Sequence, residues 1–108
     1  MTLKTRKDIH TLHTLIRTYY DAYNIIHDSK IDESTYFLVV EKFFFRNSSR
    51  ASLSIVIKGM DEFTSRIEAV GSGGGQGMIF KFDWGAKESF ERAIPKILER
   101  EGIAFDIL

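Results

Sequence analysis

The spacing of hydrophobic and polar positions changes along the chain and divides it into helical and strand-like stretches. Near the N-terminus apolar residues recur every three or four positions, which is the period of a helix with one buried face. The stripe consists of Ile9, Leu12, Leu15, Ile16, Tyr19, Tyr23 and Ile26. Thr5 with Asp8 three residues later resembles a capping box. We therefore expect a helix that begins near Thr5 and ends around residues 28–30.

Strand character takes over after this helix, because apolar and polar side chains then alternate, which indicates strands with one buried face. The segments between the strands are too short for the crossover that parallel neighbours need. We therefore expect an antiparallel meander. Its four strands are predicted at Tyr36–Arg46, Ala51–Lys58, Phe63–Val70 and Gly77–Trp84.

A second helix is predicted near the C-terminus, where helical spacing returns at Phe90, Ala93, Ile94, Ile97 and Leu98. Gly102 should end it, because glycine tolerates the left-handed conformation of a helix cap. Pro95 lies inside the segment, so we expect a kink or a break there. The alternating tail, residues 103–108, forms either a short final strand or an arm.

These elements predict an α+β fold: a four-stranded antiparallel meander with two helices packed on one face, in the order α-β-β-β-β-α. The chain has 108 residues, close to the usual size of one domain, so residues 1–108 should form a single domain.

The first predicted strand is apolar on both faces. Tyr36, Leu38 and Val40 lie on one side, and Phe37, Val39 and Phe43 on the other. In a simple meander this strand is an edge, and an unpaired apolar edge invites aggregation. Three covers are open: a helix or the tail of the same chain, a second copy in a homodimer, or an apolar ligand.

Charge and composition narrow the class of partner. Fifteen Lys and Arg balance fifteen Asp and Glu, and no basic stripe is visible, so nucleic acid is not an expected partner. Near-neutrality is a hint toward self-association. The chain has no cysteine, which fits a reducing cytoplasm. No signal peptide is visible and the longest apolar run is too short to span a bilayer, so no membrane association is expected.

Five of the eight glycines fall within residues 71–77, Gly-Ser-Gly-Gly-Gly-Gln-Gly, between two predicted strands. Such a loop either turns the chain or gathers its amide groups around a small anion. In the second interpretation Arg66 or Lys81 supplies a cation. The loop is neither a Walker motif nor a dinucleotide fingerprint, because it lacks their context. The candidate ligand-binding residues are Ser72, Gly73, Gly74, Gly75, Gln76 and Lys81.

The remaining candidate residues do not define a reaction. His10 and His13 share one helical face and could bind a metal, but no third ligand is evident, so no metal or cofactor is predicted. Glu41 and Glu68 could approach each other across the sheet, without a spacing that indicates a catalytic pair. Ser72 precedes a strand, unlike the nucleophile of a serine hydrolase. No catalytic residue is predicted.

The segment from Ala69 to Gly85 has a distinctive order: the glycine-rich loop, an apolar strand with Phe80-Lys81-Phe82, and the junction Trp84-Gly85 before the last helix. It resembles a family of small bacterial α+β proteins of unknown function that carry a Gly-Ser-Gly-Gly-x-Gln loop before the last strand. The resemblance implies a bacterial cytoplasmic protein and supplies no activity.

Two functions remain open from the sequence. The first is a non-enzymatic binding or interaction module that self-associates, since catalytic signatures are missing and apolar surface is in surplus. The alternative is a small-molecule or anion-binding protein, conceivably an enzyme, whose pocket is closed by residues 71–77.

Overall fold

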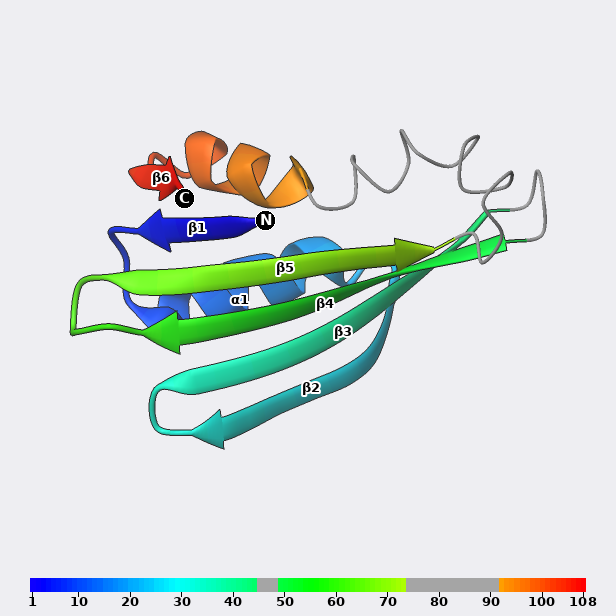
Figure 1. The fold of residues 1–108 in the computed structure, drawn as a ribbon, viewed down its shortest axis with the longest axis horizontal. Coiled ribbons are helices and arrows are strands. Elements are labelled where there is room, and N and C mark those ends of the chain that lie inside the picture. The colour runs from blue at the N-terminus through cyan, green and yellow to red at the C-terminus, as the bar shows by residue number, and fades with distance from the viewer. Residues whose placement is uncertain (45–48, 74–91) are drawn as a thin grey trace.

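The computed structural model describes residues 1–44, 49–73 and 92–108. In these residues six antiparallel strands form one sheet in the order β2-β3-β4-β5-β1-β6 (Figure 1). The elements are β1 (Thr2–Thr5), α1 (Ile9–Tyr20), β2 (Asn24–Asp32), β3 (Thr35–Phe44), β4 (Ser49–Gly59), β5 (Ser65–Gly73) and β6 (Phe105–Ile107). A C-terminal helix occupies residues 92–100.

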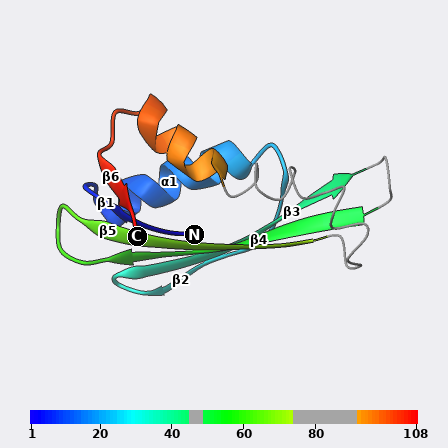
Figure 2. The same ribbon diagram turned by 45° about the horizontal axis from the view of Figure 1, so that its top comes forward.

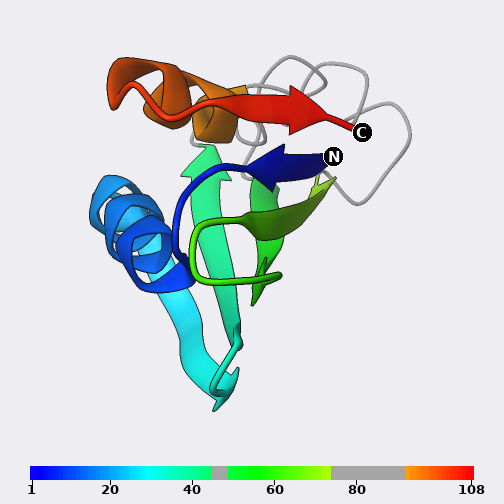
Figure 3. The ribbon, with the colours of Figure 1, turned by 90° about the vertical axis from the view of Figure 1, so that its left-hand side faces the viewer.

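The predicted four-stranded meander is wrong, although the α+β class holds. The consecutive strands β3, β4 and β5 are antiparallel neighbours, but β2 extends the sheet on one side, and β1 and β6 extend it on the other. The predicted strand Gly77–Trp84 lies outside the described residues. Both helices cover the same face of the sheet, which leaves the opposite face without a described covering element (Figures 2 and 3).

Helix α1 begins later than predicted. Asp8 is its N-cap, because the Asp8 carboxylate accepts a hydrogen bond from the backbone N–H of Thr11 at 3.0 Å. Thr5, the predicted cap, belongs to β1 instead, where its hydroxyl donates to the carbonyl of Ser65 on β5 at 3.3 Å. The buried stripe of α1 keeps the predicted spacing, with Ile9, Leu12, Ile16 and Tyr20.

The same helix ends at Tyr20, eight to ten residues earlier than predicted, and the chain then forms β2. Ile25, Ile26 and Ile31 are β-branched residues, which favour extended backbone. Pairing with β3 decides the outcome, since it satisfies the backbone groups along the outer side of that strand. The helical spacing of Tyr23 and Ile26 was therefore misleading.

Strand β3 is consequently an interior strand, and its prediction as an edge is wrong. It pairs with β2 on one side and with β4 on the other. Leu38 and Val40 are fully buried beneath the helices. Phe37 and Val39 face the other side and are half-buried. Strand β2 of the same chain therefore covers the edge of β3, and most of β2 had been predicted as the end of the first helix.

The third predicted strand is displaced along the sequence. Phe63 lies in the β4–β5 turn with 74% of its surface exposed, and the Asp61 carboxylate accepts hydrogen bonds from the backbone N–H groups of Phe63 and Thr64. Strand β5 starts only at Ser65 and continues through Gly73, so three residues of the predicted glycine loop are part of the sheet.

The core lies between the sheet and the two helices. At one point α1 and β4 approach so closely that a Cβ atom on Gly59 would lie 2.9 Å from Cγ2 of Ile9. The largest fully buried side chains are Tyr20, Leu3, Leu12, Ile16, Leu38, Leu53, Ile55, Ile57, Ile67, Ile94, Ile97 and Leu98.

The C-terminal region is partly as predicted. Residues 92–100 are helical without a break at Pro95. Gly102 follows with φ +71°, as expected for a glycine cap. The tail forms a strand: β6 pairs with β1, placing Ile107 opposite Leu3. The two ends of the chain therefore lie side by side in the sheet (Figure 3).

Candidate functional site

A cluster of polar side chains joins α1 to the strands β2 and β3. His13 Nε2 lies 2.8 Å from Asp28 Oδ1, and Arg17 Nε donates to Asp28 Oδ2 at 2.7 Å. His10 Nδ1 lies 2.8 Å from the hydroxyl oxygen of Tyr36. The Tyr36 ring stacks on His13, with centroids 4.0 Å apart and planes 13° from parallel. Two histidines of the helix thus contact two neighbouring strands.

The Asp28 carboxylate is the charged centre of this cluster. Its burial raises the pKa, but the hydrogen bonds from His13 and Arg17, together with their charges, outweigh burial and hold the pKa of Asp28 below its ordinary value of 3.8. Both carboxylate oxygens are occupied, and 24% of the side chain remains exposed. Asp28 is therefore ionised at neutral pH and fastens β2 to the helix.

The histidines do not share a ligand, because His10 contacts Tyr36 and His13 contacts Asp28. Within the described residues no group of three or more His, Cys, Asp or Glu side chains is arranged to hold a metal ion. The two histidines therefore attach the helix to its neighbouring strands through separate hydrogen bonds.

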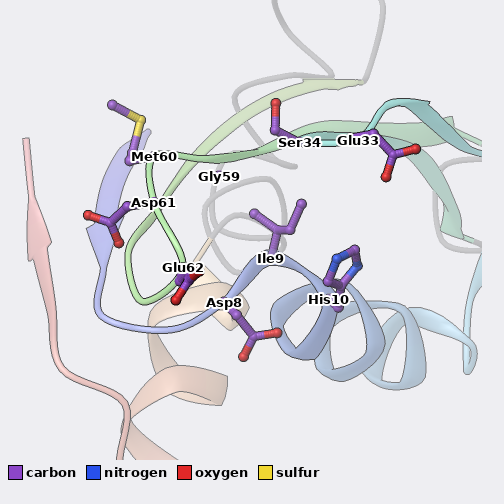
Figure 4. A pocket seen from close by; sticks show the side chains of 9 residues that line it. All are labelled: Asp8, Ile9, His10, Glu33, Ser34, Gly59, Met60, Asp61 and Glu62. Atoms are coloured by element: carbon purple, nitrogen blue, oxygen red, sulfur yellow. The ribbon is translucent and has the colours of Figure 1, made fainter.

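An open groove of about 480 Å³ lies where the start of α1 meets the β2–β3 and β4–β5 turns (Figure 4). Ile9 points into the groove between acidic side chains that come from three different segments. The lining residues are Asp8, Ile9, His10, Glu33, Ser34, Gly59, Met60, Asp61 and Glu62.

Two of the carboxylates in this groove already have backbone partners. The N–H of Thr11 lowers the pKa of Asp8, and the N–H of Phe63 lowers the pKa of Asp61. These acids hold a helix start and a turn in place. The groove is acidic as a consequence of local structure, and its carboxylates do not converge on one point as metal ligands would.

The face of the sheet opposite the helices carries an apolar band formed by Phe37, Val39, Val56 and Val70. Phe37 lies directly opposite Val56, and Val39 and Val70 lie on either side of Ser54. Phe37, Val39 and Val56 are half-buried, and Val70 is 64% exposed. No described element covers this band (Figure 2).

The structure describes only part of the predicted ligand site. Ser72 and Gly73 lie in β5, where Ser72 is the register partner of Ser52 on β4. Gly74, Gly75, Gln76 and Lys81 lie outside the described residues.

The two glutamates considered as a pair do not meet. Glu41 on β3 is bridged to Arg50, and Glu68 on β5 is bridged to Arg66, with strand β4 between them. Each carboxylate is neutralised by its own arginine, so they do not form a catalytic pair.

Comparison with known families assigns the chain without assigning an activity. The model of a family of unknown function, DUF6054, matches residues 7–102. The chain belongs to this family. No curated protein and no solved structure matches it significantly.

For this DUF6054 protein the prediction of a family of unknown function is confirmed. The family match does not include β1 before residue 7 or β6 after residue 102. None of the described helices is long and apolar enough to cross a membrane.

The sequence did not indicate that Arg17, Asp28 and Tyr36 form one cluster with the two histidines. Arg17 lies four residues after His13, on the same helical face, which was a usable signal. Asp28 and Tyr36 could not be placed, because residue 28 had been assigned to the helix and Tyr36 to an edge strand.

Proposed function

We propose that this protein is a non-enzymatic binding module that forms a homodimer through the open face of its sheet. The apolar band of Phe37, Val39, Val56 and Val70 carries the proposal, since the described residues leave it uncovered. Apolar side chains gathered on an uncovered face are typical of interaction sites.

The sheet edges are poor alternatives for self-association. Pairing of β2 with β3 is interrupted between Ile25 and His27 and again between Lys30 and Asp32. Such irregularities, together with charged side chains on an edge, hinder pairing with another strand. The opposite edge, β6, has only three residues. The open face therefore offers the better surface.

A second copy of the chain suits this face. The band consists of two adjacent cross-strand rows, Phe37 with Val56, and Val39 and Val70 on either side of Ser54. A two-fold axis running across the strands between these rows would place each row on the other row of the second copy, as an isologous interface requires. The formal net charge is zero, so no long-range repulsion opposes association.

Sedimentation velocity over a range of concentrations tests the proposal. We expect a dimer for the wild type and a monomer for Val70→Lys, because a lysine in the band would be buried without a partner. Ile31→Lys is the matched control: Ile31 is a β-branched strand residue of similar exposure, 61%, but lies on the edge strand β2. This variant should remain dimeric.

Two results would contradict the face-to-face dimer. One is a wild type that is monomeric at every concentration. The other is the reverse pattern, in which Ile31→Lys dissociates the dimer and Val70→Lys does not, since that would place the interface at the β2 edge.

The loop and the cellular location also belong to the proposal. Ligand binding by residues 71–77 is supported only by their glycine content, and cytoplasmic location by the lack of cysteine. A bacterial origin is supported only by the resemblance of residues 69–85 to a bacterial family.

A further inference from the structure

Three cationic side chains form one cross-strand row at the end of the open face that adjoins the β4–β5 turn. Lys58 on β4 lies opposite Arg66 on β5, and Arg66 lies opposite Lys4 on β1. All three are exposed and alternate with buried residues of their strands, which places them on the face away from the helices.

Like charges directly opposite each other destabilise a sheet. Arg66, the middle residue of the row, forms an ion pair with Glu68 at 3.3 Å. Lys4 and Lys58 have no ion-pair partner in the described part of the chain. Asp106 is the register partner of Lys4 but does not reach ion-pair distance. The row therefore retains two positive charges without ion-pair partners.

The carboxylates of Asp32 and Asp61 lie near the row but accept hydrogen bonds from their own turns. Asp32 accepts hydrogen bonds from the backbone N–H and hydroxyl of Ser34, and Asp61 accepts from the backbone of the β4–β5 turn. The backbone N–H groups of Ser34 and Phe63 are the main cause of the lowered pKa values of Asp32 and Asp61, and the charges of Lys58 and Lys4 contribute less. Neither carboxylate replaces a direct partner for a lysine.

An apolar hollow of about 330 Å³ adjoins this row. Val56 and Met60 form its apolar side, and Lys58, Arg66 and Glu68 form its polar side. Met60 is 57% exposed, so its thioether is available to a ligand. The volume is at the lower end of the range for small-molecule sites.

We propose that this hollow binds a small phosphate monoester with a short apolar body. The phosphate carries about two negative charges at neutral pH, which suit Lys58 on the wall of the hollow and Lys4, which lies outside the hollow at the far end of the same row. Its apolar part would lie over Val56 and Met60. This site goes beyond the proposed dimer, because its charged residues lie beside the apolar band; Val56 belongs to both, so the ligand and the second copy would compete for this side chain.

Titration calorimetry with three probes of equal chain length tests the charge requirement. We expect octyl phosphate to bind, octanoate to bind more weakly, and octanol not to bind. Rising salt should weaken the binding of octyl phosphate, because exposed charges are screened. In amide NMR spectra the shifts caused by octyl phosphate should concentrate at Lys4, Lys58 and Arg66.

Lys58→Gln separates a binding role from a structural one. The substitution should weaken the binding of octyl phosphate roughly tenfold, as expected for the loss of one charged hydrogen bond. In the absence of ligand the same variant should melt at a slightly higher temperature than the wild type, because an opposed like charge is removed. Lys96→Gln, an equal charge change on the C-terminal helix, should change neither property.

Three outcomes would overturn the site. Octanol could bind as well as octyl phosphate, which would show that only apolar contact matters. Lys58→Gln could bind octyl phosphate like the wild type. Lys58→Gln could also melt at a lower temperature without ligand, which would show that Lys58 stabilises the fold.

Discussion

At the scale of single residues, Asp28 is the member of the polar cluster whose side chain contacts both His13 and Arg17. Among the described residues it lies on an edge strand, β2, which pairs with β3 and with no second strand. Its contacts with His13 and Arg17 add a second attachment, to α1. The cluster therefore restrains an edge strand of the sheet.

Replacing Asp28 with asparagine should lower the free energy of unfolding at pH 7 by about 1–2 kcal/mol, because the neutral amide weakens two charge-assisted hydrogen bonds at a partly exposed site. Urea unfolding measures the effect. Asp21→Asn is the control: Asp21 follows α1 and is exposed, so its replacement should change the stability by no more than about 0.5 kcal/mol.

The pH dependence of this effect has a definite sign. The pKa of Asp28 is lower in the folded protein than its ordinary value of 3.8, so the carboxylate stabilises the fold above that value. The stabilisation disappears as the pH falls through the lowered pKa. The difference between wild type and Asp28→Asn should therefore shrink as the pH falls below 3.8. A difference that persisted unchanged into strong acid would show that the charge of Asp28 contributes nothing.

At the scale of elements, β1 is short but structurally central. It has four residues and lies between β5 and β6, with Leu3 fully buried. A segment of this length carries too few alternating positions to be recognised from sequence. Its position in the sheet shows that residues 2–5 contribute to the core of the fold.

Leu3→Ala should lower the free energy of unfolding by about 2–5 kcal/mol, the usual cost of truncating a fully buried leucine. Chemical denaturation measures the loss. Leu108→Ala makes the same truncation at an exposed position near the other terminus and should cost less than about 0.5 kcal/mol. Equal effects of the two variants would show that β1 does not pack as described.

The sequence predicted correctly those elements that depend on side-chain period, and it failed where backbone pairing between distant segments decides the structure. The alternation in β4 and the buried stripe of α1 were predicted correctly. Each of these elements buries one side in the core between the sheet and the helices, so its apolar residues follow a regular period. The end of α1 was misplaced, since Tyr23 and Ile26 continue the helical spacing while the backbone of residues 24–32 pairs with β3. The period of hydrophobic residues indicates which side of a segment is apolar, but it does not indicate which other segment the backbone will pair with.

At the scale of the whole molecule, the two faces of the sheet differ in what they offer. The helices bury one face, and the other carries the apolar band and, at its end, the row of Lys4, Arg66 and Lys58. Both proposed sites therefore lie on one side of the sheet. The polar cluster, in contrast, lies where α1 crosses β2 and β3.

Dimerisation through the band should make thermal stability depend on protein concentration. Because association stabilises the folded state by mass action, raising the concentration about a hundredfold should raise the Tm of the wild type by a few degrees. Val70→Lys should melt at the same temperature at every concentration. Differential scanning calorimetry measures both, and a wild-type Tm that is independent of concentration would contradict the dimer.

The sequence by itself determined the α+β class, the strands β3, β4 and β5 in their order, the buried stripe of α1 and the left-handed cap at Gly102. These are local properties, because side-chain period and glycine's allowed φ values are set within a few residues. Only the tertiary structure decided that β1, β2 and β6 complete the sheet, and hence that Asp28 meets His13 and that Lys4 joins Arg66. Strand pairing uses backbone groups that nearly every residue has, so the choice of partner is made by the packing of the whole chain.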